Sequence, residues 1–458
     1  MTEDNRKAPR IGFVSLGCPK NLVDSEVMLG TLARQGYIIT PHKEEADVLV
    51  VNTCGFIDTA KQESIDTILE MVEMKNSGNC KKLVVAGCLA ERYRTEIQKE
   101  IPEIDFVFGP DELGRILEAV RLDDGAATEA DISIDALYTS MEVPTIPRVL
   151  TTPGHMAYVK ISEGCDHVCT FCAIPGFRGR FRSRSVKDLV AEAHRLADQG
   201  VREIVLVSQD TMAYGKDLGM TDGITTLLRQ LAQVDGLKWV RFLYCYPNTV
   251  TESLVRLVAE EDRLCKYFDI PYQHASKKVL DRMRRGGSRD IYERQIESIR
   301  KWNPAAGLRT SFITGFPGES EDDFREILTF MRNAVFDNVG VFVYSDEEGT
   351  AAFDLDGKVP RRTAVRRRNQ VMKAQAGISK AKLRKMVGQR VEVLLEGASD
   401  ESELLLKGRM ETQAPDIDGH VLINDAGDEP VRNGEFYQVE ITESMEYDLI
   451  GRIVLEDR

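Results

Sequence analysis

Apolar runs that alternate with helical stretches constrain the fold of this chain more than any other feature. In its N-terminal part, RIGFVSLG, ADVLVVNT, KKLVVAG and DFVFG are separated by stretches in which apolar residues recur at helical spacing. Apolar β-branched strands joined by helices are typical of a parallel sheet covered by helices on both faces. We therefore predict an N-terminal doubly wound α/β domain over residues 9–124, and a linker over residues 125–150, where the pattern is lost.

The same alternation resumes at Thr151 and repeats about six times. The strand candidates are AYVKIS, REIVLVSQ, WVRFLYCY, YFDIPYQ, RTSFITGF and VGVFVYS. Six strand–helix units are fewer than the eight of a closed barrel, so we predict an open, partial (β/α)6 barrel over residues 151–388. A second doubly wound sheet is the alternative. Both architectures place a ligand at the carboxyl ends of the strands.

Five short strands follow at close spacing near the C-terminus: VEVLLEG, ELLLKGRM, HVLIN, FYQVEITES and LIGRIVL. This pattern predicts a small antiparallel β-barrel of the oligonucleotide-binding kind over residues 391–458.

The charge of the chain changes sign at the border of this last domain. Residues 358–385 hold eleven basic residues and no acidic one, whereas residues 390–458 hold 18 acidic and six basic residues. We expect a basic helical connector and an acidic barrel, with Asp416, Asp418, Asp425 and Asp428 among the charges at the barrel's surface. A change of charge of this kind often marks a domain boundary.

Cysteine usage and apolar runs indicate the compartment. No apolar run is long enough to span a bilayer, and the N-terminus lacks the apolar core of a secretory signal. Nine cysteines in a large chain without a leader favour reduced thiols, and we expect a cytoplasmic protein without membrane contact. Only six histidines are present and no HExxH occurs, which counts against a zinc hydrolase built on histidine.

Three cysteines lie close together directly after the first strand of the predicted barrel. Cys165, Cys169 and Cys172 occur in GCDHVCTFC, and the nearest other cysteines are more than 70 residues away. Ligation by thiolates alone indicates zinc or an iron–sulfur cluster. A zinc site of four cysteines would need a fourth thiol nearby, whereas three ligands leave one position open for chemistry.

A second set of cysteines is dispersed in sequence but equivalent in position. Cys18, Cys54 and Cys88 each follow one of the first three long strands, next to a glycine. Carboxyl ends of neighbouring parallel strands meet at one edge of a sheet, about 5 Å apart. We therefore expect these three thiols to converge, whereas Cys80, Cys245 and Cys265 show no such pattern and are taken as ordinary thiols.

The CxxxCxxC spacing, with Phe171 just before its last cysteine, resembles the signature of radical S-adenosylmethionine enzymes. Together with the N-terminal cysteines and the small C-terminal barrel, it resembles the methylthiotransferase family over nearly the whole chain. The stretch SLGCPKNLVDSE at 15–26 is most similar to the RimO type, which acts on ribosomal protein S-twelve.

The resemblance implies two [4Fe-4S] clusters, one held by Cys165, Cys169 and Cys172 and an auxiliary one held by Cys18, Cys54 and Cys88. It also implies that S-adenosylmethionine is both radical source and methyl donor, and that the C-terminal barrel is TRAM-like. The implied reaction inserts sulfur and a methyl group at the β-carbon of an aspartate of ribosomal protein S-twelve, giving 3-methylthioaspartate. The implied electron donor is reduced flavodoxin or ferredoxin, and we expect a monomer.

Residues near the strand ends of the predicted barrel are candidates for the cofactor pocket. A glycine-rich turn after the fifth strand would let backbone approach adenosine or its methionyl part closely. The candidates are Phe171, Gln209, Asp210, Gln273, His274, Arg309, Gly315, Phe316, Pro317 and Gly318.

The charge of the C-terminal barrel bears on the substrate. Affinity for a phosphate backbone comes largely from Lys and Arg, so an acidic barrel repels RNA and attracts a basic protein such as ribosomal protein S-twelve, free or within the small subunit. The alternatives are a tRNA adenosine methylthiotransferase and, outside enzymes, an iron–sulfur electron-transfer or scaffold protein. Cleavage of S-adenosylmethionine separates the enzymes from the scaffold.

Overall fold

The computed structural model describes residues 9–122, 147–400, 402, 404–427 and 430–454, and most of the predicted linker at 125–150 lies outside them. The chain divides into two compact units. Unit 1 comprises Met1–Thr151, Lys160–His167 and Cys172–Leu189; unit 2 comprises Thr152–Val159, Val168–Phe171 and Val190–Arg458. The predicted domain borders stay a prediction.

The N-terminal sheet of unit 1 is parallel throughout, in the order β2-β1-β3-β4-β5. Its strands are β1 (Arg10–Ser15), β2 (Ile38–Thr40), β3 (Val48–Thr53), β4 (Lys82–Gly87) and β5 (Phe106–Phe108). Sequence analysis missed only β2, because three residues at the edge of a sheet are too short to show a pattern.

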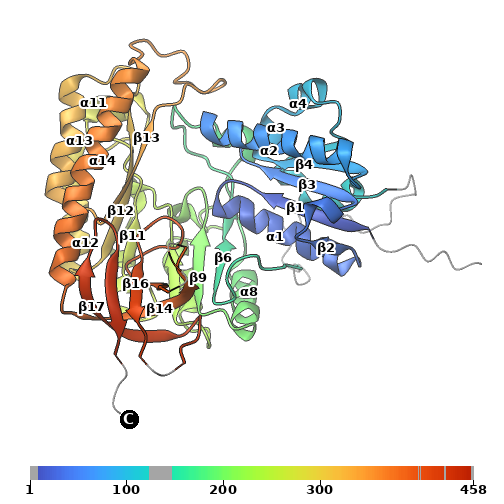
Figure 1. Cartoon of the computed structure of the whole chain (residues 1–458). Helices are drawn as coiled ribbons and strands as arrows, with labels where there is room; N and C mark the ends of the chain where they lie inside the picture. Colours follow the sequence, from blue (N-terminus) through green and yellow to red (C-terminus); the bar gives the residue numbers. More distant parts are fainter. Residues whose placement is uncertain (1–8, 123–146, 401, 403, 428–429, 455–458) are drawn as a thin grey trace, which may run out of the picture. The chain divides into compact units, whose positions relative to one another are not determined.

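Helices cover both faces of this sheet, as predicted (Figure 1). They are α1 (Pro19–Arg34), α2 (Asp58–Ser77), α3 (Cys88–Arg92), α4 (Arg94–Glu100) and α5 (Ile116–Ala119). Alternate residues of β3 point to opposite faces: Val50 packs with Met28 of α1, and Leu49 with Ile68 of α2. These two apolar cores hold the sheet rigidly, and its carboxyl edge is thereby fixed in position.

The six strands predicted for the central region are present. They are β6 (Met156–Lys160), β9 (Glu203–Val207), β10 (Trp239–Phe242), β11 (Tyr267–Asp269), β12 (Gly307–Thr314) and β13 (Asn338–Val343). They form two three-stranded sheets, β10-β9-β6 and β11-β12-β13, joined by a single bridge between Val240 and Leu264. The strands follow chain order without the reversal of a doubly wound sheet, so the open barrel is confirmed and the alternative is not.

The strands of the barrel alternate with α8 (Val186–Asp198), α9 (Gly223–Leu231), α10 (Glu252–Glu260), α11 (Lys277–Arg282), α12 (Arg289–Trp302) and α13 (Glu321–Ala334). A short hairpin of β7 (Ser162–Glu163) and β8 (Arg182–Ser183) flanks α7 (Ile174–Arg178) in unit 1. The predicted basic connector is α14 (Arg361–Leu383). Among the helices that the structure describes, none is both long and apolar enough to cross a membrane.

The C-terminal strands close into a five-stranded barrel, in the order β14-β15-β16-β18-β17. They are β14 (Arg390–Ala398), β15 (Leu406–Arg409), β16 (Val421–Asp425), β17 (Phe436–Ser444) and β18 (Leu449–Ile453). The prediction of an antiparallel barrel needs one correction, since β16 and β18 pair in parallel. A closed ring of five strands cannot alternate direction all the way round, so at least one neighbouring pair must be parallel.

Within unit 2, this barrel is fastened to the central strands by buried charges that we call the seam network: Glu203, Arg241, Glu396 and Arg409. Arg409 bonds Glu203 at 2.6 Å and Glu396 at 2.8 Å, and Arg241 bonds Glu203 at 2.7 Å.

Tyrosine hydroxyls of the central strands reach two aspartates of the same barrel. Tyr158 donates to Asp416 and Tyr267 to Asp418, each at 2.7 Å. The expectation that Asp418 is a surface charge is therefore wrong, because its side chain is fully buried. Asp416 accepts the hydrogen bond from Tyr158, Asp425 is exposed, and Asp428 lies outside the described residues.

Candidate functional site

Three cysteines lie at the carboxyl edge of the N-terminal sheet, and we call them the cysteine rim. Cys18 precedes α1 just after β1, Cys54 follows β3 directly, and Cys88 is the first residue of α3 after β4. Since β1, β3 and β4 are neighbours in the sheet, the structure places all three cysteines at adjacent strand ends.

The turns that carry the rim are packed backbone against backbone. Gly17 has φ +91°, and a Cβ added there would lie 3.1 Å from the Cys54 sulfur. Gly87 has φ +95°, and a Cβ added there would lie 2.5 Å from the Thr53 carbonyl oxygen. The side-chain amide of Asn21 donates to the carbonyls before Cys18 and Cys54, at Leu16 (2.7 Å) and Thr53 (3.3 Å). A side chain at either glycine would force these turns apart.

The three thiols differ in their readiness to ionise. Burial opposes the thiolate of Cys18, but the charges of Lys20 and Arg178 and backbone N–H groups at the start of α1 outweigh it, so its pKa is lowered. Burial raises the pKa of Cys54. Burial raises the pKa of Cys88 to about 12, and the charges of Cys18 and Cys54 add to the shift.

Ionisation of one rim thiol therefore opposes ionisation of the others. A metal centre relieves this repulsion, because binding replaces the thiol protons by positive charge. Three cysteines at adjacent strand ends have the ligand chemistry of an iron–sulfur cluster whose fourth iron would stay open. Among the described residues, no three Cys, His, Asp or Glu side chains are already arranged as the ligands of a metal ion.

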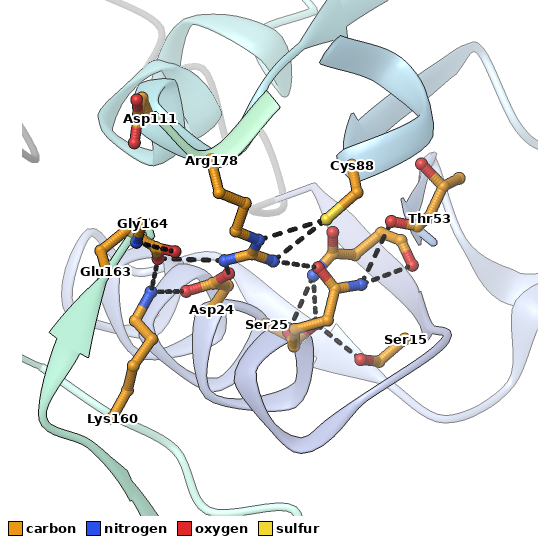
Figure 2. A network of polar contacts seen from close by, with 12 residues as sticks. Ser15, Asp24, Ser25, Thr53, Cys88, Asp111, Lys160, Glu163, Gly164 and Arg178 are labelled. Atoms are coloured by element: carbon orange, nitrogen blue, oxygen red, sulfur yellow. Dashed lines mark hydrogen bonds and ion pairs between the residues drawn. The ribbon is translucent and has the colours of Figure 1, made fainter. Parts of the chain in front are cut away.

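Arg178, the last residue of α7, reaches the rim from a later part of unit 1 (Figure 2). Its Nε and Nη2 donate to the Cys88 sulfur at 3.3 and 3.2 Å, and Nη2 also donates to the Asn21 amide oxygen at 3.1 Å. Its Nη1 donates to Asp24 at 2.9 Å and to Glu163 at 3.0 Å. The side chain is only 2% exposed, so these contacts are made without competing solvent.

A lysine completes this cluster, which we call the rim network: Asp24, Lys160, Glu163 and Arg178. Lys160 bonds Asp24 and, at 2.7 Å, Glu163. Burial opposes the charge of Glu163, but Arg178 and Lys160 outweigh it and lower the pKa of that carboxyl. Burial likewise opposes the charge of Arg178, but the neighbouring Cys88 sulfur and the carboxylates of Glu163 and Asp24 raise its pKa and keep it protonated.

The second cysteine set lies on the loop between β7 and α7. Cys165, Cys169 and Cys172 are all half-buried, as is Phe171. The Cys165 N–H donates to the Gly179 carbonyl at 3.1 Å, and the Cys169 sulfur accepts from Arg285 at 3.6 Å. Cys80, Cys245 and Cys265 are buried, in keeping with ordinary thiols.

Two candidates for the cofactor pocket are held by the protein itself. His274 is fully buried; its Nδ1 accepts from the Ser276 N–H at 2.9 Å, and its Nε2 lies 3.3 Å from Glu319. Glu319 also accepts from Arg367 of α14 at 2.5 Å. Asp210 is 1% exposed and caps a short helix by accepting from Met212 at 3.0 Å. Both side chains therefore have partners within the protein, and their place in a cofactor pocket stays a prediction.

The glycine turn after β12 is tightly packed against other parts of unit 2. A Cβ at Gly315, with φ +80°, would lie 2.2 Å from the Cβ of Ala364 in α14. Arg282 donates to the Pro317 carbonyl at 3.1 Å and would lie 2.9 Å from a Cβ at Gly318. Phe316 is fully buried. The approach of α14 and Arg282 explains why a side chain would not fit at either glycine, and contact of this turn with a cofactor stays a prediction.

Arg309 is not brought together with the other pocket candidates. It lies near the start of β12, whereas Gly315 follows its end, and it pairs with Asp269 at 2.9 Å. It lines a cavity of about 330 Å³ together with Asp418 and Tyr447 of the C-terminal barrel. Gln273 lies four residues after the end of β11 and bridges to Phe312 of β12: it has φ +70°, and its N–H donates to the Ser311 carbonyl at 2.8 Å. Gln209 lies two residues after the end of β9 and is partly buried.

Sequence reasoning missed the rim network entirely. One signal was available in NLVDSE, where polar residues at Asn21, Asp24 and Ser25 share a face of α1 and are all buried. Helical spacing places residues three and four apart on one face, so this polar face could have been noticed next to Cys18. No comparable signal pointed to Arg178, which lies among other arginines in GFRGRFRSR.

Comparison with protein families assigns three parts of the chain. Residues 10–109 match the Uncharacterized protein family UPF0004, residues 159–331 match the Radical SAM superfamily, and residues 387–454 match the TRAM domain.

Curated relatives match the chain nearly from end to end. The Ribosomal protein uS12 methylthiotransferase RimO of Koribacter versatilis is 49% identical over 99% of this chain and 98% of its own length. The protein of the same name from Solibacter usitatus is 52% identical over 97% of this chain and 95% of its own length.

Among solved structures, the radical S-adenosylmethionine methyltransferase TsrM from Kitasatospora setae shares the fold. Its TM-score is 0.54 at 15% identity, with 74% of this chain and 75% of that chain covered.

Proposed function

Because this chain belongs to the family of RimO ribosomal protein uS12 methylthiotransferases, we propose that it inserts sulfur and a methyl group at the β-carbon of an aspartate of that ribosomal protein. The observation that carries the proposal is the presence of two separate three-cysteine sets, one built into a sheet edge and one on a single loop. One set suffices to cleave S-adenosylmethionine, and the second is needed to carry sulfur.

The cysteine rim is suited to hold the auxiliary [4Fe-4S] cluster, and Cys165, Cys169 and Cys172 to hold the cluster that binds S-adenosylmethionine. When bound, these groups supply a one-electron hydrogen abstraction and the sulfur atom to be inserted. Such chemistry is required because the β-carbon of an aspartate bears no acidic hydrogen at neutral pH. Lys20 and Arg178 oppose the negative charge that collects on the rim sulfurs, and burial of Cys88 and Arg178 limits access of water.

The surface of the C-terminal barrel supports a basic protein substrate. Its exposed acidic residues include Asp400, Asp425, Glu435, Glu443 and Glu446. Complementary charge steers encounter with a partner and disfavours partners of like charge, such as RNA. We further propose that reduced flavodoxin or ferredoxin is the electron donor, and that the enzyme acts as a monomer in the cytoplasm, where its substrate is made.

The assignment is tested by incubating the anaerobically reconstituted protein with S-adenosylmethionine, dithionite and either ribosomal protein uS12 or tRNA. Mass spectrometry should find one methylthio group on the uS12 aspartate and none on tRNA. The matched control, with Cys165, Cys169 and Cys172 changed to Ala, should give no product. A methylthiolated tRNA adenosine would overturn the choice of substrate, and absence of S-adenosylmethionine cleavage would favour the scaffold protein.

Iron content tests the number of clusters. The reconstituted protein should bind about eight irons, and replacing either three-cysteine set by Ala should leave about four. A triple variant that keeps its full iron content would contradict the assignment of those three residues.

A further inference from the structure

The contact between Arg178 and Cys88 stands out among the charged groups of the molecule. A buried arginine ordinarily meets carboxylates and carbonyl oxygens, but here two of its N–H groups point at one sulfur, at 3.2 and 3.3 Å. Both side chains are nearly inaccessible, with Arg178 2% and Cys88 5% exposed. Sulfur hydrogen bonds of this length are within the normal range, and a guanidinium makes them charge-assisted.

The rest of the rim network fixes the direction of this guanidinium. Nη1 is held by Asp24 and Glu163, which leaves Nε and Nη2 facing the sulfur (Figure 2). The two carboxylates are matched by Lys160 and Arg178, so the four charges of the network cancel before the sulfur is counted. Arg178 therefore acts on the sulfur through two directed N–H groups rather than through surplus positive charge.

The same short segment also contacts the other cysteine set. Arg178 is followed by Gly179, whose carbonyl accepts the N–H of Cys165, and Glu163 accepts the N–H of Gly164 at 3.2 Å. A Cβ at Gly164 would lie 2.0 Å from the Arg180 carbonyl oxygen, so the two segments pass too close for any side chain at position 164. Gly179 thus binds the backbone of Cys165, the first cysteine of the loop, while Arg178 contacts Cys88, the last cysteine of the rim.

We propose that Arg178 is a positioning residue for the auxiliary cluster, and that its two N–H groups at the Cys88 sulfur raise the reduction potential of that cluster and slow its loss. The inference rests on the proposed function, in which the cysteine rim holds iron. One-electron reduction adds one negative charge to a cluster, and hydrogen bonds to its cysteine sulfurs stabilise that charge. Groups that contact the ligands of a metal also orient those ligands and tune the metal.

The experiment uses the full chain with Cys165, Cys169 and Cys172 changed to Ala, so that only the auxiliary cluster is present. Into this parent we introduce Arg178→Lys, which keeps the positive charge but removes the two N–H groups that face the sulfur. A second variant, the charge-neutral pair, combines Arg178→Gln with Asp24→Asn, so that one positive and one negative charge are removed together. Arg182→Gln is the matched control, because Arg182 lies on the same segment and bonds Asp111 at 2.7 Å rather than sulfur. Each protein is reconstituted anaerobically and titrated with dithionite under electron paramagnetic resonance, and iron release to a chelator is timed.

The charge-neutral pair should lower the equilibrium constant for reduction about tenfold, a shift of about 59 mV to more negative potential for one electron. It should also release iron several-fold faster. Arg178→Lys should show a smaller shift in the same direction, and Arg182→Gln should match the parent.

Three results would overturn the inference: potentials of both Arg178 variants equal to the parent's, an equal shift in Arg182→Gln, or iron loss that merely follows a lowered unfolding temperature in every variant. A parent that binds no iron would instead contradict the cluster assignment under the proposed function, so the two failures are distinguishable.

Discussion

The rim network of unit 1 and the seam network of unit 2 are built from the same kinds of residue. Their buried arginines, however, donate hydrogen bonds to different kinds of atom. In the seam network, the nearly inaccessible guanidiniums of Arg241 and Arg409 donate hydrogen bonds to carboxylates and backbone carbonyls, and Arg241 also lies over the ring of Tyr267. In the rim network, the equally buried Arg178 gives two of its N–H groups to a sulfur. Burial and ion pairing therefore do not by themselves distinguish a structural arginine from a functional one. The kind of atom that accepts the hydrogen bond distinguishes them.

The comparison predicts that damage to the seam network affects stability and leaves iron content per folded molecule unchanged. Arg409→Met would leave Glu203 and Glu396 without their shared partner, and breaking a buried pair from one side costs about 3–5 kcal/mol. The denaturant midpoint of the anaerobic holoprotein measures this loss.

A matched control lies on the surface of the same barrel. Arg452→Met removes an exposed pair with Glu440 and should cost less than about 1 kcal/mol. If the folded Arg409→Met protein lost as much iron as an Arg178 variant, the seam network would affect the cluster as the rim network does. The proposed difference between the two networks would then be wrong.

A second effect concerns Asp418 of the C-terminal barrel. Its neighbours do not fully balance the cost of burying its negative charge. Burial raises its pKa to about 6, despite hydrogen bonds from Tyr267 and Ala414 and the charge of Arg309. Since the folded state binds this proton more tightly than the unfolded state, Asp418 costs stability as pH rises from about 4 to 6, by up to about 3 kcal/mol.

Asp418→Asn should therefore be at least as stable as the parent at pH 8 and should lose this part of the pH dependence. Unfolding midpoints between pH 4 and pH 8 measure it. A variant that is less stable at pH 8 but keeps the parent's pH dependence would show that Asp418 is charged and well paired in the folded state.

The smallest effect concerns exposed acidic residues, where solvent screens each charge. Changing Asp425, Glu443 and Glu446 to Lys should weaken binding of ribosomal protein uS12 several-fold at low salt, and the difference should shrink as the Debye length falls from about 10 Å at 0.1 M to about 3 Å at 1 M. Titration at two salt concentrations measures it.

The control makes the same change in net charge on α2 of unit 1, at exposed Asp66, Glu70 and Glu73. Equal weakening by both triple variants would show that net charge, rather than the barrel surface, attracts the substrate.

Much of the fold could be predicted because apolar strands leave a clear pattern. Buried runs such as VLVV of β3 identify a parallel sheet, and its topology then places Cys18, Cys54 and Cys88 at one edge. Buried charges leave no such pattern, because Lys, Arg, Asp and Glu in a sequence are most often exposed. For that reason Arg178 and Glu163 were missed and Asp418 was misplaced at the surface.

The pocket candidates show a related limit. Glycines that allow close approach look the same in sequence whether the neighbour is a ligand or another helix. At Gly315 the neighbour is Ala364 of α14, far along the chain, and only tertiary structure reveals it.

One variant separates the tasks that we propose for the two cysteine sets. With Cys18, Cys54 and Cys88 changed to Ala, the account predicts about four irons, continued formation of 5′-deoxyadenosine from S-adenosylmethionine, and no methylthiolated uS12. Mass spectrometry of both products in one anaerobic reaction gives the answer. A folded variant that retains four irons but makes no 5′-deoxyadenosine, or one that still modifies uS12, would contradict the account.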